Sequence, residues 1–347
     1  MSIIQSFISH QIWLQQNASH EVNELAPFIQ QMRDEVKKKV RAFGDDSRTR
    51  QNLEKLLKDL NAILSGITGD WETKLTEDLQ ALAKYEADWV AKTLQVAVKT
   101  EFVTPSPEQV WSAIKFNPLD LDHKPADFIA LMSGWGTTEV NRLVMGVKSG
   151  FVQGLTTRQI TQNVVGAGGL ADISQRNAAT VVRTALNHVS TEAREMVYKK
   201  NSDIVKEYEI VATLDSRTST ICRFYDGQKY EVGKGPLPPF HPNCRTTTAP
   251  VLSSEFDFLD AGAKRAARGA DGGEQVNANT TYYEFLKQQP AWFQDKALGP
   301  VRGSIFRNAG MTTEEFRKAS VDGFGRPLTL KEMAETDKRV AEYLEDK

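Results

Sequence analysis

Residues Gly235–Arg245 read GPLPPFHPNCR and form the most rigid stretch of the sequence. Four of these eleven residues are proline, which fixes φ and has no backbone N–H to donate. A helix or an inner strand cannot continue through such a segment. We therefore expect an irregular loop, braced by Pro238 and Pro239, that holds His241 and Cys244 in a fixed place.

The sequence on both sides of this loop predicts a small sheet. Residues 208–214 and 246–251 are rich in β-branched side chains, as strands are. Asp226 and Gly227 stand between two aromatic-containing runs, and this dipeptide is typical of a two-residue hairpin turn. We predict a small β-hairpin-containing module over residues 201–262.

Both cysteines of the chain, Cys222 and Cys244, fall within 23 residues, and His241 lies between them. Thiolate and imidazole are zinc ligands, and three of them with a water molecule make a catalytic zinc site. A structural zinc would need a fourth ligand, such as Asp215 or Asp226. The interpretation that we favour needs no cofactor: the cysteines pack as small apolar groups. Zinc on these three residues and a disulfide between the cysteines are the alternatives.

A second set of polar residues around the loop indicates a structural role. We expect Asp215, Arg217 and Arg245 to form a buried polar network, because arginine and carboxylate groups form directional, bidentate hydrogen bonds. Such a network would fix the module in shape rather than perform chemistry.

Helical periodicity dominates the first third of the chain. Apolar residues recur every three or four positions from Ser47 to about Thr100. A break at Ser65–Asp70 predicts two helices in an antiparallel hairpin. Prolines 105 and 107 mark a boundary, so we expect a helical N-terminal arm over residues 1–105.

Residues 106–200 are predicted to form a central helical region. A threonine three residues before Gln159 is a capping-box signal that opens a helix at Thr157. The next helix is expected to begin near Ser174 and to carry His188 as a buried, hydrogen-bonded structural residue.

Residues 263–347 are predicted to form a C-terminal helical region that ends in one amphipathic helix over Thr329–Asp346. It begins with a basic run followed by glycines, which predicts a flexible surface stretch. Lys264, Arg265 and Arg268 in this run are candidates for contacts with DNA phosphate. The alternative is a mobile loop without such a partner.

Composition and charge limit the classes of function. The chain has 347 residues, of which 25% are charged and 40% hydrophobic, and this excludes a wholly disordered protein. A formal net charge of −2 argues against binding nucleic acid through bulk positive charge. Two cysteines make no disulfide framework, so we expect a reducing compartment. Without a secretory signal or a long apolar run, the sequence predicts a soluble, intracellular protein of the α+β class.

The motifs around the proline-rich loop occur in a characteristic order. They are TLDSRT (213–218), CR (222–223), DG (226–227) and GPLPPFHPNCR (235–245), preceded by ISQR (173–176) and VRTALNH (182–188) and followed by FLKQQP (285–290), LGPVR (298–302) and GRPLTL (325–330). In this order they resemble the phage Mu F-like minor head proteins, also called head-morphogenesis proteins of tailed phages. The resemblance covers roughly residues 135–335, and its most specific part is the His-Pro-Asn-Cys-Arg block.

The resemblance implies a virion component present in few copies. Its partners would be the portal protein, other head proteins and the packaged DNA, with no membrane, and it would act in head assembly and in DNA packaging or ejection. It would be assembled in the host cytoplasm and lie in the capsid interior near the portal vertex. Many relatives have further cysteines where this chain has Ser219 and Thr246, so a four-cysteine metal site cannot be carried over.

We therefore expect a structural protein and not an enzyme. The alternative is a metal-assisted hydrolase or a toxin-like enzyme that uses Cys222, His241 and Cys244. A DNA-binding module is a third hypothesis, which the near-neutral charge weighs against.

Overall fold

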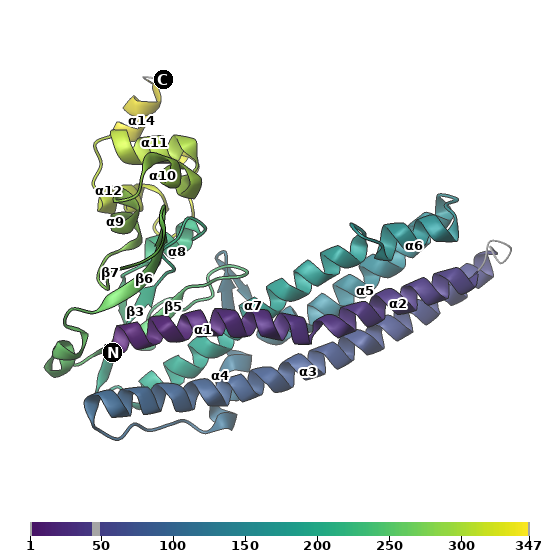
Figure 1. The fold of residues 1–347 in the computed structure, drawn as a ribbon, viewed down its shortest axis with the longest axis horizontal. Coiled ribbons are helices and arrows are strands. Elements are labelled where there is room, and N and C mark those ends of the chain that lie inside the picture. Colours follow the sequence, from purple (N-terminus) through teal and green to yellow (C-terminus); the bar gives the residue numbers. More distant parts are fainter. Residues whose placement is uncertain (1, 44–48, 346–347) are drawn as a thin grey trace.

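The computed structural model describes residues 2–43 and 49–345 and confirms the α+β class. A long helical arm runs along one axis, and the C-terminal helices stand on one end of it, beside the sheets (Figure 1). Both termini lie on the side of the molecule away from the tip of the arm (Figure 1). No helix in the described ranges is long and apolar enough to cross a membrane.

The arm is built from helices of both the N-terminal and the central region. Its members are α1 (Ile3–Glu24), α2 (Ala26–Phe43), α3 (Arg50–Val98), α5 (Phe128–Val152), α6 (Thr157–Val165) and α7 (Leu170–Lys200). The short α4 (Pro107–Phe116) and the hairpin of β1 (Leu119–Leu121) and β2 (Lys124–Ala126) connect α3 to α5. Because α3 packs along α2, α5 and α7, the two predicted regions share one hydrophobic cluster.

Helix α3 is continuous through Ser65–Asp70, so the predicted break there is wrong. Its 49 residues give a length of about 73 Å. Gly66 and Gly69 lie on the exposed face, and each costs the helix only about 1 kcal/mol relative to alanine. On the opposite face Trp71 is fully buried, with its ring 4.1 Å from that of Trp135 on α5. Burial of this face outweighs the two glycines, and α3 packs on α2, α5 and α7.

The predicted capping box opens α6, as expected. The hydroxyl of Thr156 accepts a hydrogen bond from the Gln159 N–H, and the Gln159 side chain accepts one from the Thr156 N–H. Helix α7 begins at Leu170, one turn before the predicted start. His188 of α7 is buried, and its Nε2 lies 3.0 Å from the Ile114 carbonyl, as predicted for a structural histidine.

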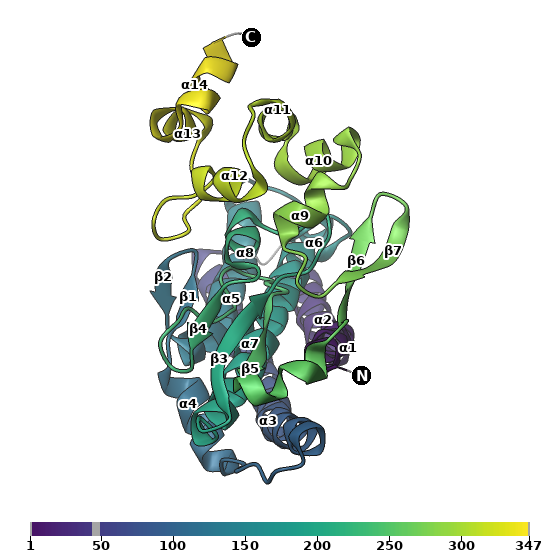
Figure 2. The same ribbon diagram turned by 90° about the vertical axis from the view of Figure 1, so that its left-hand side faces the viewer.

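A three-stranded antiparallel sheet lies in front of α7 (Figure 2). Its strands are β3 (Val205–Val211), β4 (Lys229–Glu231) and β5 (Thr247–Leu252), in the order β4-β3-β5. The predicted hairpin turn at Asp226–Gly227 is wrong, because the residues before it form helix α8 (Thr220–Tyr225). β4 therefore pairs with β3, which lies before α8 in the sequence.

A buried ionic cluster joins the arm to the sheet. Glu86 of α3 accepts hydrogen bonds from Arg194 and Ser190 of α7 and from His10 of α1. Arg194 also donates to the Thr247 hydroxyl on β5. Although burial alone would raise the pKa of Glu86, the charge of Arg194 lowers it. These contacts fix the position of β5, which directly follows the proline-rich loop.

The C-terminal region begins with strands, which corrects the prediction of an entirely helical region after residue 262. The basic run forms β6 (Lys264–Gly269), which pairs with β7 (Gly272–Asn277), so it is not a flexible stretch. The 3₁₀ helix η1 (Ser254–Asp260) precedes this hairpin. In the part of the chain that the structure describes, six helices follow the hairpin: α9 (Tyr282–Lys287), α10 (Ala291–Leu298), α11 (Pro300–Asn308), α12 (Thr313–Ala319), α13 (Leu330–Thr336) and α14 (Lys338–Glu345). These last helices share a second hydrophobic cluster.

The single predicted terminal helix is two helices. α13 ends before Asp337, whose extended backbone separates it from α14. The last predicted helical residue, Asp346, lies outside the described residues.

Candidate functional site

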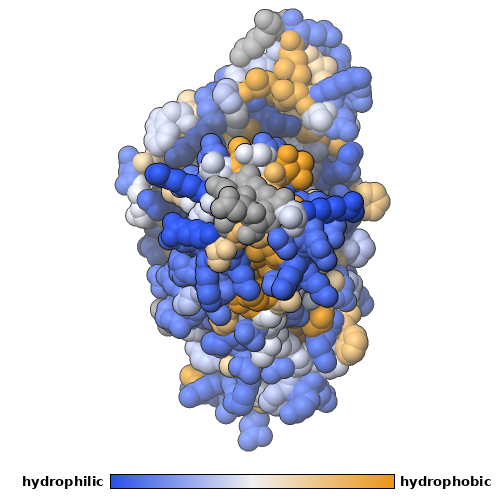
Figure 3. Space-filling view, turned by 90° about the vertical axis from the view of Figure 1, so that its right-hand side faces the viewer, coloured by the Kyte–Doolittle hydropathy of each residue, from blue (hydrophilic) through white to orange (hydrophobic). Residues whose placement is uncertain are grey.

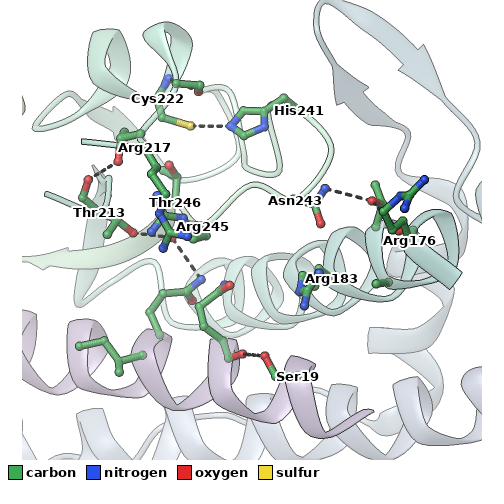
Figure 4. A pocket seen from close by; sticks show the side chains of 17 residues that line it. Ser19, Arg176, Arg183, Thr213, Arg217, Cys222, His241, Asn243, Arg245 and Thr246 are labelled. Atoms are coloured by element: carbon green, nitrogen blue, oxygen red, sulfur yellow. Dashed lines mark hydrogen bonds between the residues drawn. The ribbon is translucent and has the colours of Figure 1, made fainter. Parts of the chain in front are cut away.

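A cleft of about 770 Å³ lies between α1, α7 and the segment that carries the predicted motif (Figure 4). We call it the motif cleft; it is lined by Gln11, Ile12, Gln15 and Ser19 of α1, Arg176, Ala179, Thr180 and Arg183 of α7, and Thr213, Arg217, Thr218, Ser219, Cys222, His241, Asn243, Arg245 and Thr246. Its lining includes four arginines and no acidic residue, which favours an anionic occupant.

Cys222, His241 and Cys244 come together at the wall of the motif cleft. The Cys222 Sγ lies 3.3 Å from the His241 Nε2 (Figure 4) and 3.6 Å from the Cys244 Sγ. Both cysteines are buried free thiols, whereas His241 is half-buried. The two folded segments that meet here are α8, which carries Cys222, and the proline-rich loop, which carries the other two residues.

The orientation of the His241 ring is fixed from its far side. Its Nδ1 lies 2.8 Å from the Pro242 carbonyl oxygen. A carbonyl only accepts hydrogen bonds, so Nδ1 carries the proton and donates it. In the neutral ring the Nε2 lone pair then faces the Cys222 thiol.

The two thiols have opposite pKa shifts. Burial raises the pKa of Cys222 well above its ordinary value. Cys244 is equally buried, but its interactions with Cys222 and His241 outweigh this and hold its pKa well below the ordinary value. The pKa of His241 is raised, because its interaction with Cys244 outweighs the effect of its burial. The arrangement therefore favours a thiolate at Cys244.

The proline-rich loop is held on the sheet by Asp215. Its two carboxylate oxygens accept from the two Nη atoms of Arg245, at 2.6 and 2.9 Å. Although burial would raise the pKa of Asp215, its hydrogen bonds with Arg245 lower it. Arg217 contributes mainly its backbone N–H, which donates to Asp215, while its side chain is 76% exposed. The polar network is thus the pair Asp215–Arg245, and Arg217 is not a buried member of it.

Helix α7 holds the same loop from below. Asn187 Nδ2 donates to the carbonyl oxygens of Cys244 (2.7 Å) and Thr246 (3.2 Å), and all three residues are buried. Thr184 accepts the backbone N–H of Asn243, whose φ is +59°. The sequence analysis assigned no role to these helix residues. The signal for them was that the polar residues Thr184 and Asn187 interrupt the apolar positions of this helix.

The remaining loop residues are buried or restrained. Pro238 and Pro239 are buried, and the peptide bond between them is cis. Gly227 has a φ of +79° and donates its N–H to the Ile210 carbonyl, which ends α8 and leads into β4. The rigid loop predicted around Pro238 and Pro239 is therefore present. Gly227 has the left-handed backbone of a turn residue, but this turn follows helix α8 and does not join two strands of a hairpin.

The three candidate DNA-contact residues, Lys264, Arg265 and Arg268, do not lie on the same face of β6. Arg265 is 2% exposed and is ion-paired with buried Asp226, so the structure contradicts a DNA contact by this residue. Lys264 and Arg268 lie on the exposed face of β6 and remain predictions. Alternation along the strand explains the difference, since neighbouring residues of a strand point to opposite faces.

Two cationic residues of the motif cleft were not among the predicted site residues. Arg176 and Arg183 lie on α7, and the side chain of Arg183 stands between α7 and the motif segment (Figure 4). Within residues 2–43 and 49–345, neither is in an ion pair. Only the fold brings them beside Cys222 and His241, which lie far away in the sequence.

Comparison with known proteins finds one similarity, in the central part of the chain. Residues 141–249 match the family model described as Phage Mu protein F like protein, which confirms the expected resemblance over just under a third of the chain. The match begins within α5 and ends within β5, and it includes every lining residue of the motif cleft except those of α1. No curated protein and no solved structure matches the chain.

Proposed function

We propose that this protein is a structural minor head protein of a tailed bacteriophage that associates with the portal and acts in head assembly and in DNA packaging or ejection. The match of residues 141–249 to the phage Mu F-like family, a family of head-morphogenesis proteins, is the observation that carries the proposal. The protein would work in the host cytoplasm during assembly and remain in the capsid interior near the portal vertex. Its proposed partners are the portal protein, other head proteins and packaged DNA.

The helical arm is the proposed docking element. Its apolar faces are already buried against helices of the same chain, because α3 packs on α2, α5 and α7. A partner would therefore bind through the exposed polar surface. The face at the tip of the arm is mostly hydrophilic, with separate apolar spots (Figure 3), which suits a reversible contact made during assembly.

The proposed function is tested by capture on the portal protein and by analysis of particles. Purified protein mixed with the portal protein of its phage should be retained with it, and mass spectrometry should detect a few copies per virion or procapsid. Absence from both particles, together with no retention on the portal protein, would overturn the proposal.

Two charge reversals on α3 locate the docking surface. Arg50 lies at the tip of the arm and is 92% exposed, whereas Lys84 lies further along the same helix and is 63% exposed. Both form an exposed ion pair with an acidic residue four positions later, so Arg50→Glu and Lys84→Glu cost similar, small amounts of stability. Docking through the tip predicts weaker portal retention for Arg50→Glu alone.

The alternative of a metal-assisted hydrolase or toxin-like enzyme makes a different prediction. It requires turnover of a substrate that is lost in His241→Gln. We propose a structural role because the family is one of head proteins. Turnover that depends on this imidazole would overturn it.

A further inference from the structure

We propose that Cys222, His241 and Cys244 bind one zinc ion and leave its fourth coordination position open to the motif cleft. Their ligand atoms all lie within 4.8 Å of one another, and this is the only such group of three among the described residues. The proposal does not depend on a role in the phage head, since it rests on the geometry of these side chains.

Two of the three distances between the ligand atoms fit a single tetrahedral ion, and the third, between Cys244 and His241, is within 4.8 Å. Zinc–sulfur bonds of about 2.3 Å and zinc–nitrogen bonds of about 2.0–2.1 Å give tetrahedral edges of about 3.8 Å between two sulfurs and about 3.5 Å between sulfur and nitrogen. The observed separations are 3.6 Å for Cys222 and Cys244 and 3.3 Å for Cys222 and His241. Each of these two edges therefore needs to lengthen by only about 0.2 Å when the ion enters.

The surroundings of His241 are those of a zinc ligand. Metal-bound histidines almost always donate their second ring N–H to a carbonyl or carboxylate, which fixes the ring. The Nδ1–H of His241 donates to the Pro242 carbonyl, and this leaves Nε2 to bind the ion. The carbonyl of Cys244 is held in turn by Asn187, so the loop carrying two ligands is fixed to α7.

The chemistry of the donors selects zinc over hard cations. Two thiolates and one imidazole suit zinc, whereas magnesium and calcium prefer carboxylate and carbonyl oxygens. The group contains no carboxylate. An ion here would also join α8 to the proline-rich loop, because Cys222 belongs to the first and the other two ligands to the second.

The fourth position of the ion faces the motif cleft. Cys222 and His241 both line this cleft, together with the hydroxyl-bearing residues Ser219 and Thr246. Neutral hydroxyls are not among the usual zinc ligands, so water or an anion from the cleft would complete the site. The arginines of the cleft favour an anion.

Metal analysis of the full-length protein tests the proposal directly. Protein purified under reducing conditions should contain about one zinc per chain. After removal of the metal with a chelator, cobalt(II) should bind with a thiolate-to-metal charge-transfer band and the visible bands of a tetrahedral site. These visible bands should change on addition of azide or inorganic phosphate, which would enter the open position. A cobalt spectrum unaffected by either anion would contradict the open position.

Three substitutions test the ligands. Cys222→Ser, Cys244→Ser and His241→Gln should each weaken zinc binding by more than about 100-fold, a loss at least as large as that for outer-shell partners. His20→Gln is the matched control, since this histidine is exposed on α1 and should leave zinc binding unchanged. Circular dichroism distinguishes loss of a ligand from loss of the fold.

If the variants do not fold, zinc binding to the unsubstituted protein still tests the proposal. Added zinc should raise the unfolding temperature of the metal-free protein and slow the reaction of its two cysteines with a thiol reagent. Folded, reduced protein that binds neither zinc nor cobalt would overturn the proposal. So would a Cys222–Cys244 disulfide in protein isolated under reducing conditions.

Discussion

The guanidinium group of Arg265 donates to both carboxylate oxygens of Asp226, with distances of 3.0 Å from Nη2 to Oδ1 and 3.2 Å from Nη1 to Oδ2. The same carboxylate accepts the backbone N–H groups of Ala212 and Tyr282, each at 2.7 Å. Asp226 thus connects the end of α8 to the residue that follows β3, to β6 and to α9. This one buried side chain ties the C-terminal region to the sheet that carries the motif.

Replacing Asp226 should strongly destabilise the protein. In Asp226→Asn the buried Arg265 charge loses its counter-charge, and a broken buried ion pair costs about 3–5 kcal/mol. Urea unfolding followed by circular dichroism measures this change. The control is Asp257→Asn, an exposed aspartate, which should change the unfolding free energy by less than about 0.5 kcal/mol. Equal effects of the two substitutions would contradict the structural role of Asp226.

His188 should make the protein sensitive to mild acid. Burial lowers its pKa from 6.5 to about 4, so between these values the unfolded chain takes up a proton that the folded protein does not. His188 should therefore lower the free energy of unfolding by about 3 kcal/mol in total as the pH falls from 6.5 to 4, whereas Glu192 and Glu209, whose pKa values burial raises, act in the opposite direction. Urea unfolding at several pH values measures the slope.

The variant His188→Gln isolates this effect. Glutamine cannot take up the proton, and it can still donate to the Ile114 carbonyl that His188 now contacts. The free energy of unfolding of the unsubstituted protein, minus that of the variant, should fall by about 3 kcal/mol as the pH falls from 6.5 to 4. The control is His20→Gln, which makes the same substitution at an exposed histidine. An unchanged slope in His188→Gln would show that this histidine does not stay neutral in the fold.

Glycine replacements test the continuity of α3. Gly66 and Gly69 have nothing within 4 Å of an added Cβ, so alanine there should stabilise the helix by about 0.5–1 kcal/mol per site. Gly150 of α5 differs, because an added Cβ would lie 2.6 Å from the Ile160 side chain. Thermal unfolding should rank Gly66→Ala and Gly69→Ala above, and Gly150→Ala below, the unsubstituted protein. Destabilisation at the first two sites would indicate a turn in place of a continuous helix.

Asn187 should contribute to the stability of the proline-rich loop. In Asn187→Ala the buried carbonyls of Cys244 and Thr246 each lose a donor, which should cost about 1–3 kcal/mol. Urea unfolding gives the loss, and Asn163→Ala, on the exposed face of α6, is the matched control. Comparable losses for the two variants would contradict the role of Asn187.

The sequence correctly predicted the elements that depend on interactions between residues close together in the chain. The capping box at Thr156 opens α6 because its hydrogen bonds join residues three positions apart. The run of prolines before His241 forms an irregular loop because proline excludes regular structure. The same motif was sufficient to indicate the phage Mu F-like family, which residues 141–249 match.

The sequence predictions were wrong where contacts between distant parts of the chain outweigh local preference. The glycines of Ser65–Asp70 indicated a turn, yet the buried face opposite them keeps α3 continuous. Asp226–Gly227 indicated a hairpin turn, but helix α8 precedes it. The Asp226 carboxylate instead accepts hydrogen bonds from Arg265, which lies 39 residues later in the sequence. Arg265 looked like a surface cation in a basic run, and only its pairing with Asp226 makes it a buried structural residue.

The sequence alone determined the α+β class, the rigid proline-rich loop and the identity of the three possible metal ligands, because each depends on residue type and local pattern. The tertiary structure alone decided that those ligands meet, that Asp215 holds Arg245, and that α1 and α7 form the cleft beside them. The physical reason is that these contacts join residues far apart in the sequence, as do Asn187 and Cys244. Such contacts depend on how apolar surfaces pack, which no local signal specifies.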